Sequence, residues 1–193
     1  MKVAIVKYNA GNVQSVTHAL HRLGIDPSLT DDPQELSVAD KIIFPGVGEA
    51  STAMKYLREK KLDKVLVALK QPFLGICLGL QLMCTHSEEN DTPCLGIFDL
   101  KVKRFPPGQK IPHMGWNRVE MKDDPLFSNH SENPYLYFVH SYYAEPGPAT
   151  IGLTDYIIPF SAALHKNNYY AVQAHPEKSG KDGQLILENF LKI

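Results

Sequence analysis

The feature that most constrains the fold is the run Gly75-Ile-Cys-Leu-Gly79, which follows a short apolar segment and precedes a stretch that can be helical. A side chain raised on a sharp strand-to-helix turn needs small residues two positions before and after it, because larger ones would collide with neighbouring backbone. Gly75 and Gly79 flank Cys77 in this way. The turn would aim helix N-terminal amides at the sulfur, and such amides favour a thiolate and stabilise an oxyanion. We therefore predict that Cys77 is a nucleophile at the end of a buried strand.

Short apolar runs alternate with helical patterns through the first half of the chain. The expected strands are Val3–Lys7, Lys41–Phe44 and Phe73–Ile76. The expected helices are Asn12–Leu23, Ala50–Leu69 with an interruption near Lys60-Lys61, and Leu78–Thr85. Strands that are apolar throughout and alternate with helices indicate a parallel sheet covered on both faces.

The second half has a different pattern. From Leu95 to Tyr170 the segments are short, rich in β-branched and aromatic residues, and interrupted by Pro and Gly. This pattern favours antiparallel strands that extend the sheet or form a flap, followed by a final helix at about residues 184–191. Because no internal repeat or low-complexity linker divides the chain, we expect one α/β domain over residues 1–193.

Composition and charge argue against several classes of protein. A formal net charge of −1 offers no bulk attraction for nucleic acid or an anionic membrane. No apolar run approaches the roughly 18 residues of a membrane span, and the N-terminal run is too short for a signal peptide. Three cysteines, an odd number, do not make a disulfide framework, so we expect a reducing, cytoplasmic location.

A nucleophilic cysteine needs a general base, and His175 is the strongest candidate among eight histidines. It follows the strand-like run 169–174 and precedes Pro176-Glu177. Proline ends the strand and stiffens the turn, so that Glu177 can curl back to hold the imidazole. A lone histidine after a strand is usually a solvated loop residue, but the elbow in the same chain reverses that reading. We interpret Cys77, His175 and Glu177 as nucleophile, base and orienting carboxylate.

A second turn, Pro45-Gly-Val-Gly48, follows the expected strand at residues 41–44. Its glycines let the backbone fold tightly and present amide N–H groups, so we expect Val47 and Leu78 to supply the donors of an oxyanion hole, with Gly48 beside them. Strand-Pro-Gly turns are common, and a phosphate-binding loop is the alternative. The missing G-K-[ST] ending argues against a phosphate loop.

Together, the elbow and the His175-Pro-Glu177 segment resemble the class I, triad-type glutamine amidotransferases over most of the chain. Within that class, three strips are similar to the glutaminase subunits of imidazole glycerol phosphate synthase, an enzyme of histidine biosynthesis: Pro45–Glu49, His113–Asn117 and Tyr137–Tyr142. The resemblance implies a flavodoxin-like fold, hydrolysis of glutamine, no cofactor, and a heterodimer with a cyclase subunit that receives ammonia. A chain ending soon after the His-Pro-Glu segment fits a separate subunit.

The resemblance also implies roles for individual positions. Gln81 and Glu89 would hold the α-amino and carboxylate end of glutamine, helped by the backbone around His140, Ser141 and Tyr142. A further set would face the cyclase, near the mouth through which ammonia leaves: Asn12, Met114, Trp116, Asn117, Tyr137 and Lys178.

One segment departs from the family pattern. The first strand of the family usually ends in Asp-Tyr-Gly-x-Gly-Asn, whereas this chain reads Lys7-Tyr-Asn-Ala-Gly-Asn12. This loop lies where partner and active site are expected to communicate. We also expect weak activity without the partner, because Pro45–Gly48 can act as a two-state element whose Val47 amide faces away until the cyclase binds.

Other interpretations stay open at this point. The chain could be the amidotransferase subunit of another ammonia-using synthase, although His113–Asn117 argues against this. It could be a γ-glutamyl hydrolase or cysteine peptidase that uses the same triad without a partner. A non-catalytic binding subunit on the same fold is disfavoured by the intact Cys77, His175 and Glu177.

The remaining features are a set of Cys and His residues that could suggest zinc, and the single tryptophan. Cys84, Cys94 and His86 lack the C-x₂₋₄-C spacing of a zinc site, so we expect no metal there. We expect Cys84 to pack on the elbow helix as a small apolar residue. Trp116 would be a core residue in an arbitrary protein, and only the family resemblance moves it outward.

Overall fold

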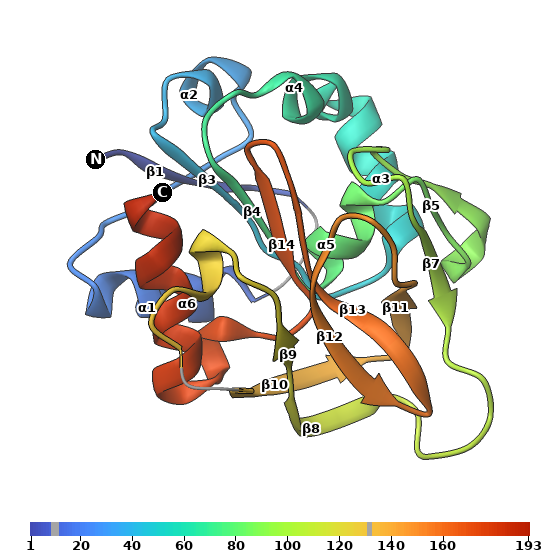
Figure 1. Cartoon of the computed structure of the whole chain (residues 1–193). Helices are drawn as coiled ribbons and strands as arrows, with labels where there is room; N and C mark the ends of the chain where they lie inside the picture. Colours follow the sequence, from blue (N-terminus) through green and yellow to red (C-terminus); the bar gives the residue numbers. More distant parts are fainter. Residues whose placement is uncertain (9–11, 131–132) are drawn as a thin grey trace.

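The computed structural model describes residues 1–8, 12–130 and 133–193, which form an α/β fold (Figure 1). Within these ranges the main sheet has the strand order β2-β1-β3-β4-β14-β13-β12-β9. The strands of its parallel part are β2 (Ser28–Thr30), β1 (Val3–Val6), β3 (Lys41–Phe44), β4 (Phe73–Ile76) and β14 (Tyr169–Val172). Antiparallel strands continue it: β13 (Ile158–Lys166), β12 (Thr150–Tyr156) and β9 (Glu120–Met121). The predicted parallel sheet with antiparallel additions is confirmed.

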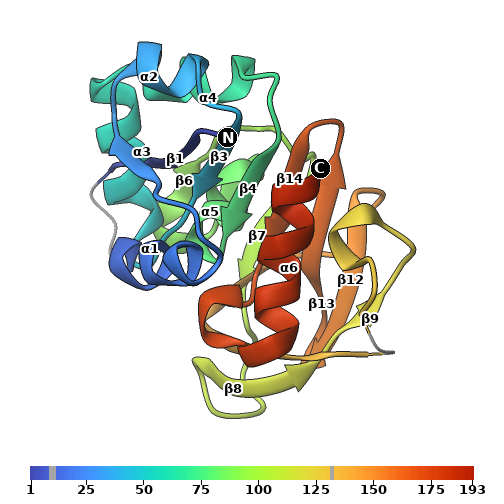
Figure 2. The same ribbon diagram turned by 90° about the vertical axis from the view of Figure 1, so that its left-hand side faces the viewer.

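The parallel strands are buried on both faces, because their side chains alternate between two apolar clusters. In β1, Ala4 and Val6 join one cluster, whereas Val3 and Ile5 join the other. The first cluster is covered by α2 (Pro33–Ser37), α3 (Ala50–Glu59), α4 (Leu62–Ala68) and α5 (Leu78–Met83). The second is covered by α1 (Val13–Arg22) and α6 (Gly180–Lys192), and Figure 2 shows α6 lying over β14 and β13.

Local backbone geometry explains where the helices differ from the expected ranges. The predicted interruption near Lys60-Lys61 is confirmed, because Lys61 takes a left-handed φ of 57° between α3 and α4. The final helix begins at Gly180, before the predicted start near residue 184. A Cβ at Gly183 would overlap the carbonyl of Pro176, so close packing there offsets the low helix propensity of glycine. Sequence patterns also miss β2 and α2, which are too short to show a period.

Two smaller sheets flank the main one. One pairs β8 (His113–Arg118) with β10 (Tyr135–His140) in antiparallel register, so that His113 lies opposite His140. The other has the order β11-β7-β5-β6, formed by β11 (Tyr142–Ala144), β7 (Lys101–Arg104), β5 (His86–Ser87) and β6 (Thr92–Pro93). Short 3₁₀ turns occur at η1 (Glu89–Asp91), η2 (Pro125–Phe127) and η3 (Pro176–Lys178). None of the described helices is long and apolar enough to cross a bilayer.

The carboxyl edge of the parallel strands gathers the chemistry-bearing segments. Strands β1, β3, β4 and β14 are neighbours and run in the same direction. The segments that leave them are Tyr8, Pro45–Gly48, Cys77 and residues 173–177. Open parallel sheets present their sites at this edge. Segments far apart in the sequence are thereby brought around one sulfur.

Candidate active site

Cys77 lies on a strained turn between β4 and α5. Its backbone takes φ 53° and ψ −106°, a conformation that L residues adopt only where the surroundings enforce it. The Cys77 amide donates to the Val172 carbonyl across the sheet at 2.8 Å. A Cβ at Gly79 would overlap the Phe44 carbonyl oxygen, and one at Gly75 would overlap the sulfur of Met83. The elbow that the two glycines predict is therefore present, for the steric reason given by the sequence.

His175 and Glu177 form a buried pair beside the elbow. Their side chains are 1% and 0% exposed, and Nδ1 of His175 lies 2.8 Å from Oε1 of Glu177. Pro176 opens the short η3 turn that brings the carboxylate back to the ring. Burial alone would lower the pKa of His175, but the neighbouring Cys77 and the hydrogen-bonded Glu177 raise this pKa to about 10. The geometry thus favours an imidazolium beside the Cys77 sulfur.

Asn12 lies on the far side of this pair. Its side-chain Nδ2 donates a hydrogen bond to the same Oε1 of Glu177 that receives His175. Asn12 is half-buried, in a left-handed conformation at the start of α1. The family resemblance predicts Asn12 at a partner face, whereas the structure places it against the Glu177 carboxylate. Residues 9–11 of the departing loop lie outside the described residues.

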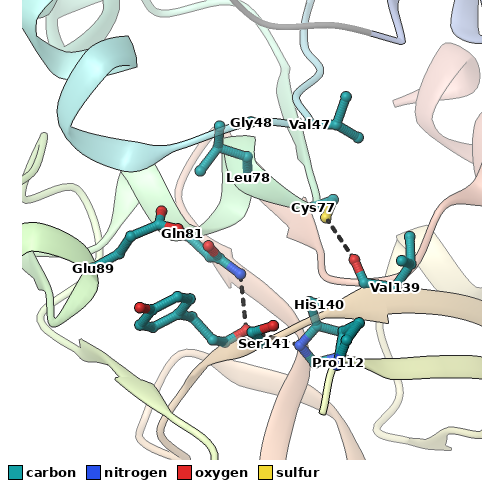
Figure 3. Close-up of a pocket in the computed structure, with 11 residues that line it drawn as sticks. Val47, Gly48, Cys77, Leu78, Gln81, Glu89, Pro112, Val139, His140 and Ser141 are labelled. Carbon is teal, nitrogen blue, oxygen red and sulfur yellow. Dashed lines mark hydrogen bonds between the residues drawn. The ribbon is translucent and has the colours of Figure 1, made fainter.

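A pocket opens next to Cys77 (Figure 3). The pocket is lined by all the residues predicted for the oxyanion hole and for glutamine binding, and by two residues that sequence reasoning missed, Pro112 and Val139. The lining residues are Val47, Gly48, Cys77, Leu78, Gln81, Glu89, Pro112, Val139, His140, Ser141 and Tyr142. Figure 3 shows Gln81 and Glu89 across the pocket from Cys77. The pocket therefore has a nucleophile at one end and polar side chains at the other.

Three hydrogen bonds hold the two polar side chains Gln81 and Glu89 that line the pocket. Nε2 of Gln81 donates to the Tyr142 carbonyl at 2.9 Å and to Oε1 of Gln173 at 3.1 Å. Oε2 of Glu89 accepts from the Ala50 amide at the start of α3, at 2.7 Å. Burial raises the pKa of Glu89, and the Ala50 amide opposes that rise. A cation bound against Glu89 would relieve the cost of burying its charge.

Gln173 is a further site residue that sequence reasoning missed. Its Nε2 lies 3.6 Å from the Cys77 sulfur, and the residue is fully buried. A signal existed in the sequence, because residues two apart in an extended segment share a side, which places Gln173 with His175. Val139 also meets the sulfur, with its carbonyl oxygen 4.0 Å from Sγ.

The two expected oxyanion donors do not face the same point in this structure. The Leu78 amide donates to the Gly46 carbonyl at 3.2 Å. Because the carbonyl of Gly46 and the amide of Val47 belong to one trans peptide, they point in opposite directions, so the Val47 amide faces away from Leu78. Tyr8 holds the same strip, since its hydroxyl donates to the Pro45 carbonyl. Burial and the neighbouring Cys77 raise the pKa of Tyr8, which keeps it a neutral donor.

The residues expected at a partner face fall into exposed and inward-facing groups. Met114 and Trp116 are 58% and 55% exposed, and the Trp116 ring lies 6.0 Å from that of Tyr137. The core interpretation of Trp116 is therefore wrong. Lys178 is exposed as well. Asn117 points inward, where its Nδ2 donates to the Asp155 carbonyl at 2.9 Å.

The structure does not bring Cys84, Cys94 and His86 together as a metal site. In the described ranges, no group of three or more His, Cys, Asp or Glu side chains is arranged to hold a metal ion. Cys84 is fully buried in the apolar cluster against α5, as expected, and burial raises the pKa of its thiol.

Comparison with known proteins identifies the family. The model of the class I glutamine amidotransferase family matches residues 4–193. A Bacteroides fragilis protein named imidazole glycerol phosphate synthase subunit HisH is 55% identical, over 100% of both chains. This chain belongs to the HisH family. A protein of the same name from Methanothermobacter thermautotrophicus is 43% identical over 99% of this chain and 98% of its own. Membership of this family makes the chain a class I glutamine amidotransferase.

Solved structures show the same fold at greater distance. A protein described as a putative GMP synthase subunit from Thermoplasma acidophilum has a TM-score of 0.76 at 20% identity, covering 100% of this chain and 92% of the other. The PurLQS structure from Thermotoga maritima has a TM-score of 0.71 at 18% identity, covering 99% of this chain and 97% of that chain. These likenesses support the class I amidotransferase fold.

Proposed function

We propose that Cys77, His175 and Glu177 hydrolyse glutamine to glutamate and ammonia, and that the ammonia passes directly to a cyclase subunit. There it is used to make imidazole glycerol phosphate and aminoimidazole carboxamide ribotide in histidine biosynthesis. The observation that carries the proposal is the buried 2.8 Å pair of His175 and Glu177 beside a cysteine on a strained elbow. The HisH name of the full-length relatives supports the choice of synthase.

Glutamine would enter with its side-chain amide toward Cys77. At the other end, the Glu89 carboxylate and the Gln81 side chain would bind the α-amino and carboxylate groups, helped by the backbone of residues 140–142. The shared pocket supports this arrangement. Burial raises the pKa of Glu89, and a bound ammonium group would offset the cost of burying its negative charge.

In the first chemical step, the Cys77 thiolate attacks the amide carbon and forms a tetrahedral oxyanion. The imidazolium of His175 donates its proton to the departing nitrogen, so that ammonia leaves and a γ-glutamyl thioester remains. Neutral His175 then removes a proton from water, which attacks the thioester and releases glutamate. Glu177 holds the ring and stabilises its positive charge.

The oxyanion hole requires a change in the strip 45–48. In this structure the Leu78 amide already donates its hydrogen bond to the Gly46 carbonyl and is not free for an oxyanion. Rotation of the Gly46–Val47 peptide would withdraw that carbonyl and present the Val47 amide beside Leu78. Such a rotation changes ψ of Gly46 and φ of Val47, and Gly46 has no Cβ to restrict its backbone. We propose that binding of the cyclase favours the rotated state, so that glutamine is consumed only when an acceptor is ready.

The cyclase would cover the surface formed by Met114, Trp116 and Tyr137, with Asn12, Asn117 and Lys178 around it. Exposed large apolar side chains on neighbouring strands are typical of an interface. The three free cysteines are consistent with a reducing cytoplasm, and we propose a cofactor-free, cytoplasmic heterodimer built from one domain of this type.

The test separates glutamine chemistry from synthase chemistry. In the complex with the cyclase, Cys77→Ala should abolish synthesis from glutamine and leave synthesis from added ammonium salt intact. Cys94→Ala, a half-buried cysteine outside the pocket, is the matched control and should keep both activities. Loss of both activities in Cys77→Ala would assign this residue a structural role, and retention of both would exclude it as the nucleophile.

A further inference from the structure

We propose that His113 and His140 are positioning residues, a neutral pair in one fixed tautomer within a hydrogen-bond chain that joins Asn117 on β8 to the Cys77 sulfur. His140 holds the Tyr142 carbonyl in place, and this carbonyl orients Gln81 and, through it, Gln173, so that an N–H of Gln173 is directed at that sulfur. The inference rests on the proposed function only in taking Cys77 as the reacting thiol.

The hydrogen-bond chain is continuous from Asn117 on β8 to Cys77 at the elbow. On β8, Nδ2 of Asn117 lies 3.3 Å from Nε2 of His113. Nδ1 of His113 lies 3.2 Å from Nε2 of His140, its cross-strand partner. Nδ1 of His140 lies 2.8 Å from the carbonyl oxygen of Tyr142.

Beyond Tyr142 the chain continues through two glutamines. The Tyr142 carbonyl also receives Nε2 of Gln81 at 2.9 Å. The same Gln81 nitrogen donates to Oε1 of Gln173 at 3.1 Å, and Nε2 of Gln173 reaches the Cys77 sulfur at 3.6 Å. Each link joins buried or half-buried groups.

The Tyr142 carbonyl determines which atom donates and which accepts in each hydrogen bond of the histidine pair. The Tyr142 oxygen can only accept, so Nδ1 of His140 must carry a proton. In a neutral ring, Nε2 of His140 is then an acceptor, which requires a proton on Nδ1 of His113. Nε2 of His113 is in turn an acceptor, and it receives the amide of Asn117.

The two ends of the chain agree independently. Nδ2 of Asn117 also donates to the Asp155 carbonyl at 2.9 Å, and its Oδ1 accepts the Arg118 amide at 2.8 Å. These contacts fix the amide orientation of Asn117 without reference to the histidines. This orientation of Asn117 is the one that the Tyr142 carbonyl requires at the other end, so no link has two donors or two acceptors facing each other.

The surroundings of the pair favour neutral rings. His113 stacks between Phe138 and Tyr156, with ring centroids 5.1 and 4.0 Å away, and His140 meets Phe105 and Phe160. Burial lowers the pKa of His113 to about 4. Burial likewise lowers the pKa of His140 to about 3, although its bond to Tyr142 opposes the shift. A charged ring would place two N–H groups against each other across the 3.2 Å link.

The consequence for the site lies in the orientation of Gln173. If its amide turned over, a carbonyl lone pair would face the Cys77 sulfur instead of an N–H. An N–H donor stabilises a thiolate, whereas a carbonyl oxygen repels it. The chain from Tyr142 through Gln81 sets the orientation that favours the reactive anion.

The first test determines, in the unmodified protein, which ring nitrogen of His113 and of His140 carries the proton. Proton–nitrogen correlation spectra of ¹⁵N-histidine protein at neutral pH should show both His113 and His140 as neutral rings protonated on Nδ1. His113→Asn and His140→Asn assign the two resonances. A ring protonated on Nε2, or a charged ring, at either position would overturn the proposal.

The second test uses isosteric variants and the rate at which iodoacetamide alkylates Cys77, followed by peptide mass spectrometry. Gln173→Met removes the donor and should slow alkylation roughly tenfold at neutral pH. His140→Asn keeps an N–H near the position of Nδ1, whereas His140→Leu, of similar size, does not. Alkylation should be several-fold slower in His140→Leu than in His140→Asn. Phe105→Leu changes packing in the same aromatic cluster without removing a link and should leave the rate unchanged.

Equal rates for Gln173→Met and the unmodified chain, or for the Leu and Asn variants, would overturn the proposal. If His140→Leu fails to fold, the pair His113→Leu and His113→Asn supplies the same comparison. Neither readout involves glutamine. Failure of glutamine hydrolysis would therefore refute the proposed function alone, and a wrong tautomer would refute this inference alone.

Discussion

The strain at the elbow has a measurable consequence for stability. At most buried positions, a protein with glycine is less stable than the same protein with alanine by about 0.5–1 kcal/mol, because glycine gives the unfolded chain more conformational freedom to lose on folding. At position 77 the backbone takes φ 53° and ψ −106°, a conformation that strains any residue carrying a Cβ. Such strained conformations cost about 1–3 kcal/mol.

Cys77→Gly and Cys77→Ala separate these effects, because both remove the sulfur and its contacts with Gln173 and the Val139 carbonyl. Relief of about 1–3 kcal/mol of strain outweighs an entropic cost of about 0.5–1 kcal/mol, so Cys77→Gly should be the more stable by about 1 kcal/mol. With an m-value of about 2 kcal/mol/M in urea, the unfolding midpoints should differ by about 0.5 M.

The assay is equilibrium urea unfolding of both variants, followed by circular dichroism with m-values compared. Neither variant should hydrolyse glutamine. If Cys77→Gly unfolds at lower urea than Cys77→Ala with the same m-value, position 77 carries no Cβ strain and the account of the elbow is wrong. Gly24, which also has a positive φ, is a useful control: Gly24→Ala should be destabilising, since it adds the strain that Cys77→Gly removes.

Two further results are expected. Glu177→Gln should lower kcat for glutamine about 10²–10⁴-fold, because the imidazolium loses its buried charged partner. KM should change little, since Glu177 does not line the pocket, and an unchanged kcat would exclude Glu177 from the triad. Acidification should destabilise the fold, because His113 and His140 have folded pKa values of about 4 and about 3, below the usual unfolded value of about 6.5. The unfolded chain takes up these protons first, so stability falls from about pH 6.5 toward pH 4. Urea unfolding should show a shallower fall in His140→Asn, and an equally steep fall would contradict neutral burial.

Much of the fold follows from local patterns. Strands β3 and β4 have the predicted bounds, because each is a short buried run ended by Pro-Gly or by the elbow. The short edge strand β2 has two exposed residues in three and no such signal. In the first turns of α6, Gly183 packs so closely on Pro176 that a Cβ would not fit, and no propensity reveals this contact.

The site is less completely predictable than the fold. Spacing alone indicates Cys77, because the glycine requirement is local. The hydrogen bond from Asn12 to Glu177 joins residues 165 positions apart, and the contact between Leu78 and the Gly46 carbonyl depends on how two strand ends meet. Long-range partners of this kind are set by sheet order, which the sequence patterns do not specify.

The measurement that tests the central claim most directly is glutamate release from glutamine, by this chain alone and with the cyclase and its nucleotide ligand. We expect slow release alone, strong stimulation in the liganded complex, and loss of both in Cys77→Ala. Rapid release that does not respond to the cyclase, or release that persists in Cys77→Ala, would contradict the account.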